Sequence, residues 1–172
     1  MRKFYTFVAA SLVLSLWQAQ SGAQGQAAPT SGKTATSWTC AAPNPVHALP
    51  VGDAPNHMYV VEQTKCTATK GEIAGVAEKE GTATEFADVV GDKARGHGVF
   101  VETLANGDKI HVTYTFDGTS KNNVFQSGSN KWTVAAGTGM FKGAKGGGTC
   151  TAKGNPDGTT AFECSGTYTL EK

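Results

Sequence analysis

The 172-residue chain carries 15 lysine and arginine residues against 14 aspartate and glutamate residues, and 39% of its residues are hydrophobic. A chain so close to neutral lacks the basic surface with which proteins hold nucleic acid or an anionic membrane. The composition therefore argues against both partners, and the length suits a single domain.

Residues 1–23 have the order of a secretory signal peptide. Arg2 and Lys3 precede 14 uncharged, mostly apolar residues, and the small residues Ser21-Gly22-Ala23 follow. The apolar run is shorter than the roughly 20 residues that a membrane-spanning helix needs. We expect cleavage after Ala23, a periplasmic or secreted protein, and no membrane association after cleavage. Cleavage would remove two of the 15 basic residues, which leaves 13 against 14 acidic ones.

Residues 24–55 are predicted to form a flexible leader and a proline-rich arm. Residues 24–37 contain almost no large apolar side chains, so they bury too little surface to become ordered. The arm that follows has Cys40 near its start and the prolines Pro43, Pro45, Pro50 and Pro55. The folded domain is then expected over residues 56–172.

The predicted domain is all-β. Its glycines recur every few residues and would interrupt a long helix, while the runs between them are rich in valine, threonine, tyrosine and phenylalanine. Strands are expected near residues 58–68, 72–78, 82–90, 98–104, 109–117, 131–135, 147–153 and 160–170, with Phe125 and Gln126 in a further short strand. Many short strands with glycine-rich turns indicate a sandwich or a barrel.

A hairpin is predicted around Asn106-Gly107, a turn dipeptide flanked by apolar alternation. A two-residue turn pairs Ala105 with Asp108 and produces one mostly apolar strand face. That face holds Val99, Val101, Thr103, Ile110, Val112, Tyr114 and Phe116. In a hollow barrel, we expect a ligand to contact Val101, Val112, Tyr114 and Phe116, together with His57 and Tyr59 near the barrel mouth.

The opposite face of the same hairpin places Glu102 across from His111 in this register. A carboxylate beside an imidazole can serve as a general acid and base. On a solvated face the same pair is an ordinary ion pair of little energetic weight. Because the other face is the apolar one, we expect this face in solvent. Glu102 and His111 become catalytic candidates only if the polar face lines the interior.

The second predicted hairpin turns at Asn155-Pro156-Asp157-Gly158, where proline and glycine fit a type I turn followed by a left-handed residue. A three-residue loop pairs Asn155 with Thr159 and therefore Cys150 with Cys164. Four cysteines in an exported chain indicate two disulfides. The register selects Cys150–Cys164, and elimination leaves Cys40–Cys66. The cysteine and histidine spacings match no metal site, so no metal is expected.

The most distinctive segment is Trp132-Thr-Val-Ala-Ala-Gly-Thr-Gly-Met-Phe141 with the glycine-rich run that continues to Cys150. Its glycine spacing differs from phosphate-binding patterns, and glycines of this kind allow bulges and sharp coiling where a sheet closes. The segment resembles the Gly-Thr-Gly-x-Phe signature of dirigent proteins and allene oxide cyclases, and bacterial allene-oxide-cyclase-like barrels most of all. The resemblance covers residues 131–150 and is compatible in strand rhythm over 58–170.

This resemblance implies an eight-stranded antiparallel barrel with a hydrophobic central cavity, which some relatives use to steer ring closure or radical coupling without a cofactor. No catalytic acid of those families maps onto this sequence. Three functions stay open: a barrel that binds a small hydrophobic or amphipathic molecule, a cofactor-independent isomerase or cyclase, and a structural or interaction module without a ligand. We expect the first, with no cofactor. Oligomeric state is not indicated by the sequence.

Overall fold

The computed structural model describes residues 30–122 and 124–171. The predicted signal peptide and its cleavage site lie outside these residues. Within them, no helix has the length and apolar character to cross a membrane.

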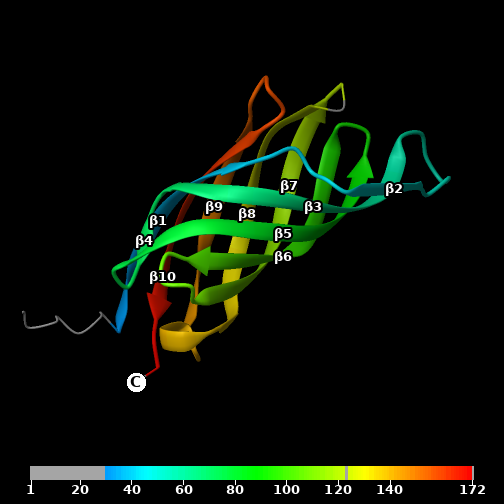
Figure 1. Cartoon of the computed structure of the whole chain (residues 1–172). Helices are drawn as coiled ribbons and strands as arrows, with labels where there is room; N and C mark the ends of the chain where they lie inside the picture. The colour runs from blue at the N-terminus through cyan, green and yellow to red at the C-terminus, as the bar shows by residue number, and fades with distance from the viewer. Residues whose placement is uncertain (1–29, 123, 172) are drawn as a thin grey trace, which may run out of the picture.

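Eight antiparallel strands close into one barrel, which confirms the predicted all-β fold (Figure 1). The barrel strands are β1 (Ser31–Cys40), β3 (His57–Lys70), β5 (Val76–Val90), β6 (Lys93–Leu104), β7 (Lys109–Lys121), β8 (Val124–Gly137), β9 (Lys145–Gly154) and β10 (Thr160–Thr169). From β5 to β10 each strand pairs with the next along the chain, and β1 closes the ring between β10 and β3. Two short strands, β2 (Val46–Pro50) and β4 (Glu72–Ile73), and the 3-10 helix η1 (Gly139–Phe141) complete the fold.

Strand β1 lies in the segment that was predicted to be a leader and an arm, so the barrel begins at residue 31 and not at residue 56. Its inward side chains are Thr34, Thr36, Trp38 and Cys40, all buried. Threonine is small enough for the crowded interior of a small barrel and favours strands, yet it contributes no apolar periodicity that a sequence pattern would detect. Strand β2 also lies in the predicted arm. It pairs with β3 only, and every residue in it is exposed.

Inward-facing glycines make room for aromatic rings in the barrel. The ring of Tyr114 lies over Gly98, that of Phe116 over Gly96, and that of Trp132 over Gly148 and Gly166. In each case an added Cβ would come within 2.8 Å of the ring. The high glycine content therefore serves side-chain packing inside the barrel as well as the turns.

Replacing Gly166 with alanine should destabilise the protein by about 2–3 kcal/mol, the cost of overpacking a core. The new Cβ would lie 2.3 Å from the Trp132 ring and 2.5 Å from the backbone oxygen of Gly147. Thermal unfolding should show a melting temperature lower by roughly 6–9 °C. Ser165→Ala, on the outer face of the same strand, is the control and should change little. Equal melting temperatures for the two variants would contradict this packing.

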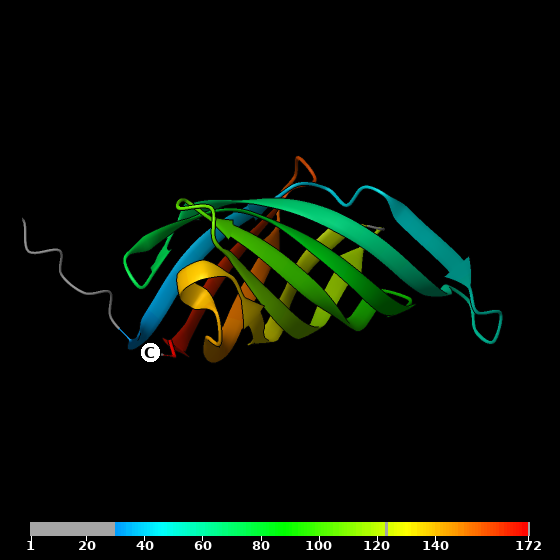
Figure 2. The same ribbon diagram turned by 60° about the horizontal axis from the view of Figure 1, so that its bottom comes forward.

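The two ends of the barrel differ in how completely they are filled. Leu104, Ile110 and Phe141 are at most 2% exposed and pack with side chains from β4, β8 and β10 into a dense core. Helix η1 and strand β4 lie at this end, whereas the hairpin of β2 and β3 projects from the opposite end (Figure 2). At that opposite end, which we call the half-open end, inward side chains such as Glu62, Glu85 and Phe116 stay half-buried, although Val60 and Ala87 are buried.

The Gly-Thr-Gly-Met-Phe segment builds the closed end. Gly139 begins η1 with φ +52°, a conformation that glycine adopts without strain. Gly137 contacts the backbone of Phe141 so closely that a Cβ would lie 2.2 Å from its carbonyl oxygen. Phe141 itself is fully buried. The Gly-Thr-Gly-Met-Phe segment, on which the family resemblance is based, therefore fills and closes one end of the barrel.

Both predicted disulfides are present. Cys150 pairs with Cys164 across β9 and β10 in the predicted register, and Cys40 pairs with Cys66 across β1 and β3. The turn between β9 and β10 also agrees, because the Asn155 amide donates to the carbonyl of Thr159. Since successive strand residues alternate between faces, the disulfide-bonded cysteines, three of them buried, mark the inward face of each strand that holds them.

The predicted register of the β6–β7 hairpin is wrong by one residue. Leu104 pairs with Asp108 around a three-residue loop, and Glu102 pairs with Ile110 instead of His111. A type I′ turn needs positive φ at both Asn106 and Gly107, whereas only Gly107 has it, with φ +87°. The side chain of Asn106 instead binds Asp108, accepting from its amide and donating to its carboxylate. Every residue of β6 thereby changes face relative to β7.

Candidate functional site

The residues predicted to contact a ligand divide between the two faces of the sheet. Val112, Tyr114 and Phe116 point into the barrel, as expected for an interior wall, and Val112 packs against the core of the closed end. Val101 pairs with His111 on the outer face, so neither reaches the interior. Glu102, expected in solvent, is 6% exposed and lies inside. The predicted Glu102–His111 acid–base pair therefore does not form.

His57 and Tyr59 lie at the start of β3, on the end of the barrel from which β2 projects. Nδ1 of His57 is 2.6 Å from Asp53 and Nε2 is 2.9 Å from Asp88. The hydrogen bond with Asp53 is the main cause that raises the pKa of His57. Because both ring nitrogens are engaged by carboxylates, His57 anchors the loop after β2 onto the barrel. Tyr59 is exposed on the outer face, edge-on to His57 and next to Phe86.

A hydrogen-bonded cluster of Glu62, Glu85 and Tyr114 lies inside the half-open end. Glu62 and Glu85 are directly paired across β3 and β5, and the Tyr114 hydroxyl donates to Glu85 Oε2 over 2.8 Å. Burial, and then the neighbouring Glu85, raise the pKa of Glu62 to about 7. Burial also raises the pKa of Glu85, and the hydrogen bonds from Tyr114 and Glu62 oppose it. Near neutral pH, Glu62 therefore holds a proton that it shares with the Glu85 carboxylate.

A second carboxyl pair, Glu78 and Glu102, lies deeper in the barrel. Burial, and then the charge of Glu78, raise the pKa of Glu102 to about 9. Burial raises the pKa of Glu78 to about 7, against a hydrogen bond with Thr36. Both pairs lack a counter-ion, because none of the ion pairs among the described residues involves an inward side chain of the barrel strands. These carboxyl groups can stay buried inside the barrel because protonation removes their charge.

Glu62, Glu78 and Glu85 were not predicted as site residues, although one signal for Glu62 was available. The Cys66 disulfide fixes the inward face of β3, and Glu62 lies four residues before it on the same face. Glu85 follows from the pairing of Glu62 with β5, a register that no turn signal specified. Among the described residues, no group of three or more histidine, cysteine or acidic side chains is placed to hold a metal ion.

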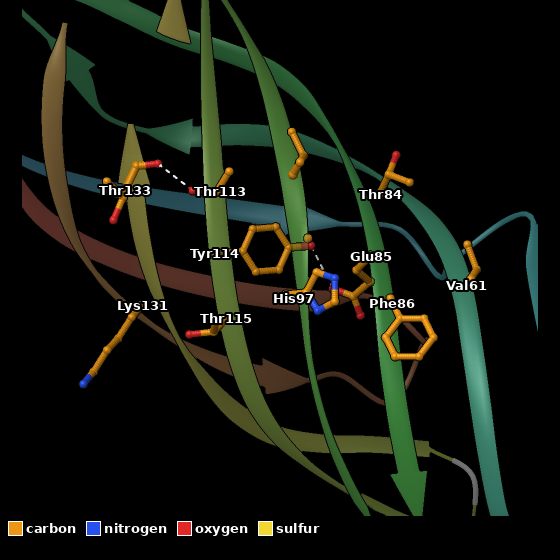
Figure 3. A pocket seen from close by; sticks show the side chains of 12 residues that line it. Val61, Thr84, Glu85, Phe86, His97, Thr113, Tyr114, Thr115, Lys131 and Thr133 are labelled. Atoms are coloured by element: carbon orange, nitrogen blue, oxygen red, sulfur yellow. Dashed lines mark hydrogen bonds between the residues drawn. The ribbon is translucent and has the colours of Figure 1, made fainter. Parts of the chain in front are cut away.

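A further hollow lies on the outer face of the sheet. A groove of about 560 Å³ runs across strands β3, β5, β6, β7 and β8. Its walls are outward side chains, including Val61, Phe86, His97, Val99 and Lys131, while Glu85 and Tyr114 belong to its floor (Figure 3). The carboxyl groups of the two inward pairs project from the other face of the sheet.

No family model and no curated protein matches the sequence. The fold matches solved structures. The pterocarpan synthase dirigent protein GePTS1 aligns with a TM-score of 0.50 and 11% identity, over 97% of this chain and 100% of that one. The pterocarpan synthase dirigent protein PsPTS1 aligns with a TM-score of 0.49 and 10% identity, over 84% and 98%. A protein with unknown function from Clostridium acetobutylicum aligns with a TM-score of 0.46 and 9% identity, over 81% of this chain and 99% of that one.

At these identities the likeness concerns the fold. The chain is an eight-stranded barrel of the dirigent type, which confirms the resemblance seen in residues 131–150 at the level of architecture. No residue correspondence follows from 11% identity. The function must therefore be argued from the side chains of this chain.

Proposed function

We propose that this protein binds a small amphipathic molecule inside its barrel. The observation that carries the proposal is a set of buried polar atoms without a hydrogen-bond partner. These atoms are Glu78 Oε2, Glu102 Oε1, Asn130 Oδ1 and Trp132 Nε1. All four belong to inward side chains. Unpaired buried polar atoms cost stability, so these inward-facing atoms indicate a polar partner inside the barrel.

The surroundings of these atoms suit a molecule with an apolar body. Phe100 packs edge-on against Trp38 inside the barrel, with ring centroids 5.0 Å apart. Tyr114 and Phe116 continue the aromatic wall toward the half-open end. Aromatic walls with a few fixed polar groups are typical of small-molecule sites. Glu62 and Glu85, half-buried at the same end, offer a proton donor and an acceptor for the polar part of the ligand.

A second candidate function is a cofactor-independent isomerase or cyclase in the same interior. It is favoured by the pKa of Glu62, which at about 7 makes this carboxyl a proton donor at neutral pH. A solved structure named as a pterocarpan synthase dirigent protein has the same fold, so a barrel of this kind is compatible with catalysis. In this reading Glu62 protonates the bound molecule, and Glu85 and Tyr114 orient Glu62.

Ala83→Trp tests the interior site, because Ala83 points inward two residues before Glu85. Native mass spectrometry of protein purified from its own host should show a retained small molecule in the wild type and none in Ala83→Trp. Val101→Trp, on the outer face, is the matched control and should retain the molecule. A wild-type protein without any bound molecule would contradict the proposal. Chemical change of the retained molecule by the wild type, but not by Glu62→Gln, would favour the enzyme over the binding protein.

A further inference from the structure

The outer groove is apolar in its walls although it faces solvent. Val61 is 47% exposed and Val99 is 43% exposed, and both lie in the groove. Phe86 packs beside His97, with ring centroids 5.7 Å apart, and Tyr59 extends the aromatic row at 5.4 Å from Phe86. A volume of about 560 Å³ lies within the range of small-molecule sites.

The polar lining of the groove has one sign of charge. The acidic side chain of its floor, Glu85, turns inward to the Tyr114 hydroxyl and is not presented to the groove. Lys131 lies on β8 at the edge of the groove, where it pairs with Thr115 and stands two residues before Thr133, and its side chain extends outward from that edge (Figure 3). It takes part in none of the ion pairs between described residues. The lining of the groove toward β8 therefore offers a cation and hydroxyl donors, and the carboxylate in the lining, Glu85, turns inward.

We propose that this groove is a second binding site, for a small amphipathic anion. The apolar body of the ligand lies on Val61, Phe86 and Val99, and its anionic group meets the Lys131 ammonium. The charge of Lys131 selects an anion over a neutral molecule of the same shape. The site is independent of the barrel interior, because its side chains lie on the other face of the sheet.

The proposal is tested with two fluorescent probes that share a ring system and differ in charge. These are 8-anilinonaphthalene-1-sulfonate, an anion, and N-phenyl-1-naphthylamine, which is neutral. The wild type should bind the anion at least threefold more tightly. Lys131→Gln should remove this preference by weakening the binding of the anion alone. Val99→Asp should weaken the binding of both probes more than tenfold. Circular dichroism confirms that each variant is folded.

Two controls separate this site from the interior. Lys153→Gln removes an exposed lysine outside the groove and should leave both affinities unchanged, as should the interior variant Ala83→Trp. Equal effects of Lys131→Gln and Lys153→Gln would overturn the proposal, and so would unchanged binding in Val99→Asp. If a variant fails to fold, the site is mapped instead on the isotope-labelled wild type, by the changes in amide chemical shift that each probe causes. Probe-induced shifts at Val61, Phe86 and Val99 support the site, and shifts confined to inward residues contradict it.

Discussion

Glu102→Gln should make the protein more stable than the wild type at pH 9 and leave its stability at pH 5 nearly unchanged. In the unfolded chain the Glu102 carboxyl titrates near 4.5, whereas burial raises its pKa to about 9 in the fold. Above pH 4.5 the unfolded state therefore releases a proton that the folded state keeps. Stability falls as the pH rises toward 9, where the folded state must ionise or unfold. Glutamine has a similar shape and never ionises, so this loss disappears.

A pKa shift of this direction and size corresponds to a loss of several kcal/mol in the free energy of unfolding between pH 5 and pH 9. At about 3 °C per kcal/mol for a domain of this length, the wild-type melting temperature should fall by roughly 15 °C over that range. Glu78, Glu62 and Glu85 contribute in the same direction, because burial raises the pKa of each. Differential scanning calorimetry across this range measures the effect. Glu72→Gln, at an exposed position, is the control, and an identical pH dependence in Glu102→Gln and Glu72→Gln would contradict the buried carboxyl.

Removing both disulfides should leave the protein without a cooperative thermal transition above 37 °C. The Cys40–Cys66 bridge spans 26 residues and Cys150–Cys164 spans 14. In the chain-entropy model these loops contribute about 3.5 and 3 kcal/mol, a large part of the stability of a small domain. Cys40→Ala/Cys66→Ala alone should lower the melting temperature by roughly 10 °C, and Cys150→Ala/Cys164→Ala by slightly less. Calorimetry of the two double variants and of the quadruple variant measures this. A quadruple variant that melts within a few degrees of the wild type would show that the bridges add little.

The parts of the fold that the sequence predicted correctly depend on strong local signals. The loop at 155–158 specifies its own register, and this register placed Cys150 opposite Cys164. The Asn106-Gly107 dipeptide was ambiguous, since the same residues fit a two-residue turn and a three-residue loop that differ by one position. Hydrophobicity did not resolve the choice. The correct register buries Glu102, a residue that an apolar-face criterion places in solvent.

The candidate site depended on long-range pairing that no local pattern specifies. The carboxyl cluster exists because β3 pairs with β5 so that Glu62 lies opposite Glu85, and because Tyr114, two strands away, reaches Glu85 across Gly98. Strand β1 was missed because two of its four buried inward residues, Thr34 and Thr36, are threonine and interrupt an apolar pattern. Both failures have the same physical origin: small and polar residues line the interior of this barrel, so the inward face does not have the apolar pattern that usually identifies it.

The position of β1 in the ring determines when the barrel can close. Ser31 pairs with Thr169, so β1, the barrel strand made first, must wait for β10, the barrel strand made last. Contacts between such distant segments carry a large loop-closure entropy and slow the folding of β proteins. Until β10 is present, β1 and β9 each leave an edge whose backbone groups are unpaired and can pair with other chains. The barrel therefore completes its hydrogen bonding only after β10 has been made, and we expect the pairing of β1 with β10 to be its slowest folding step.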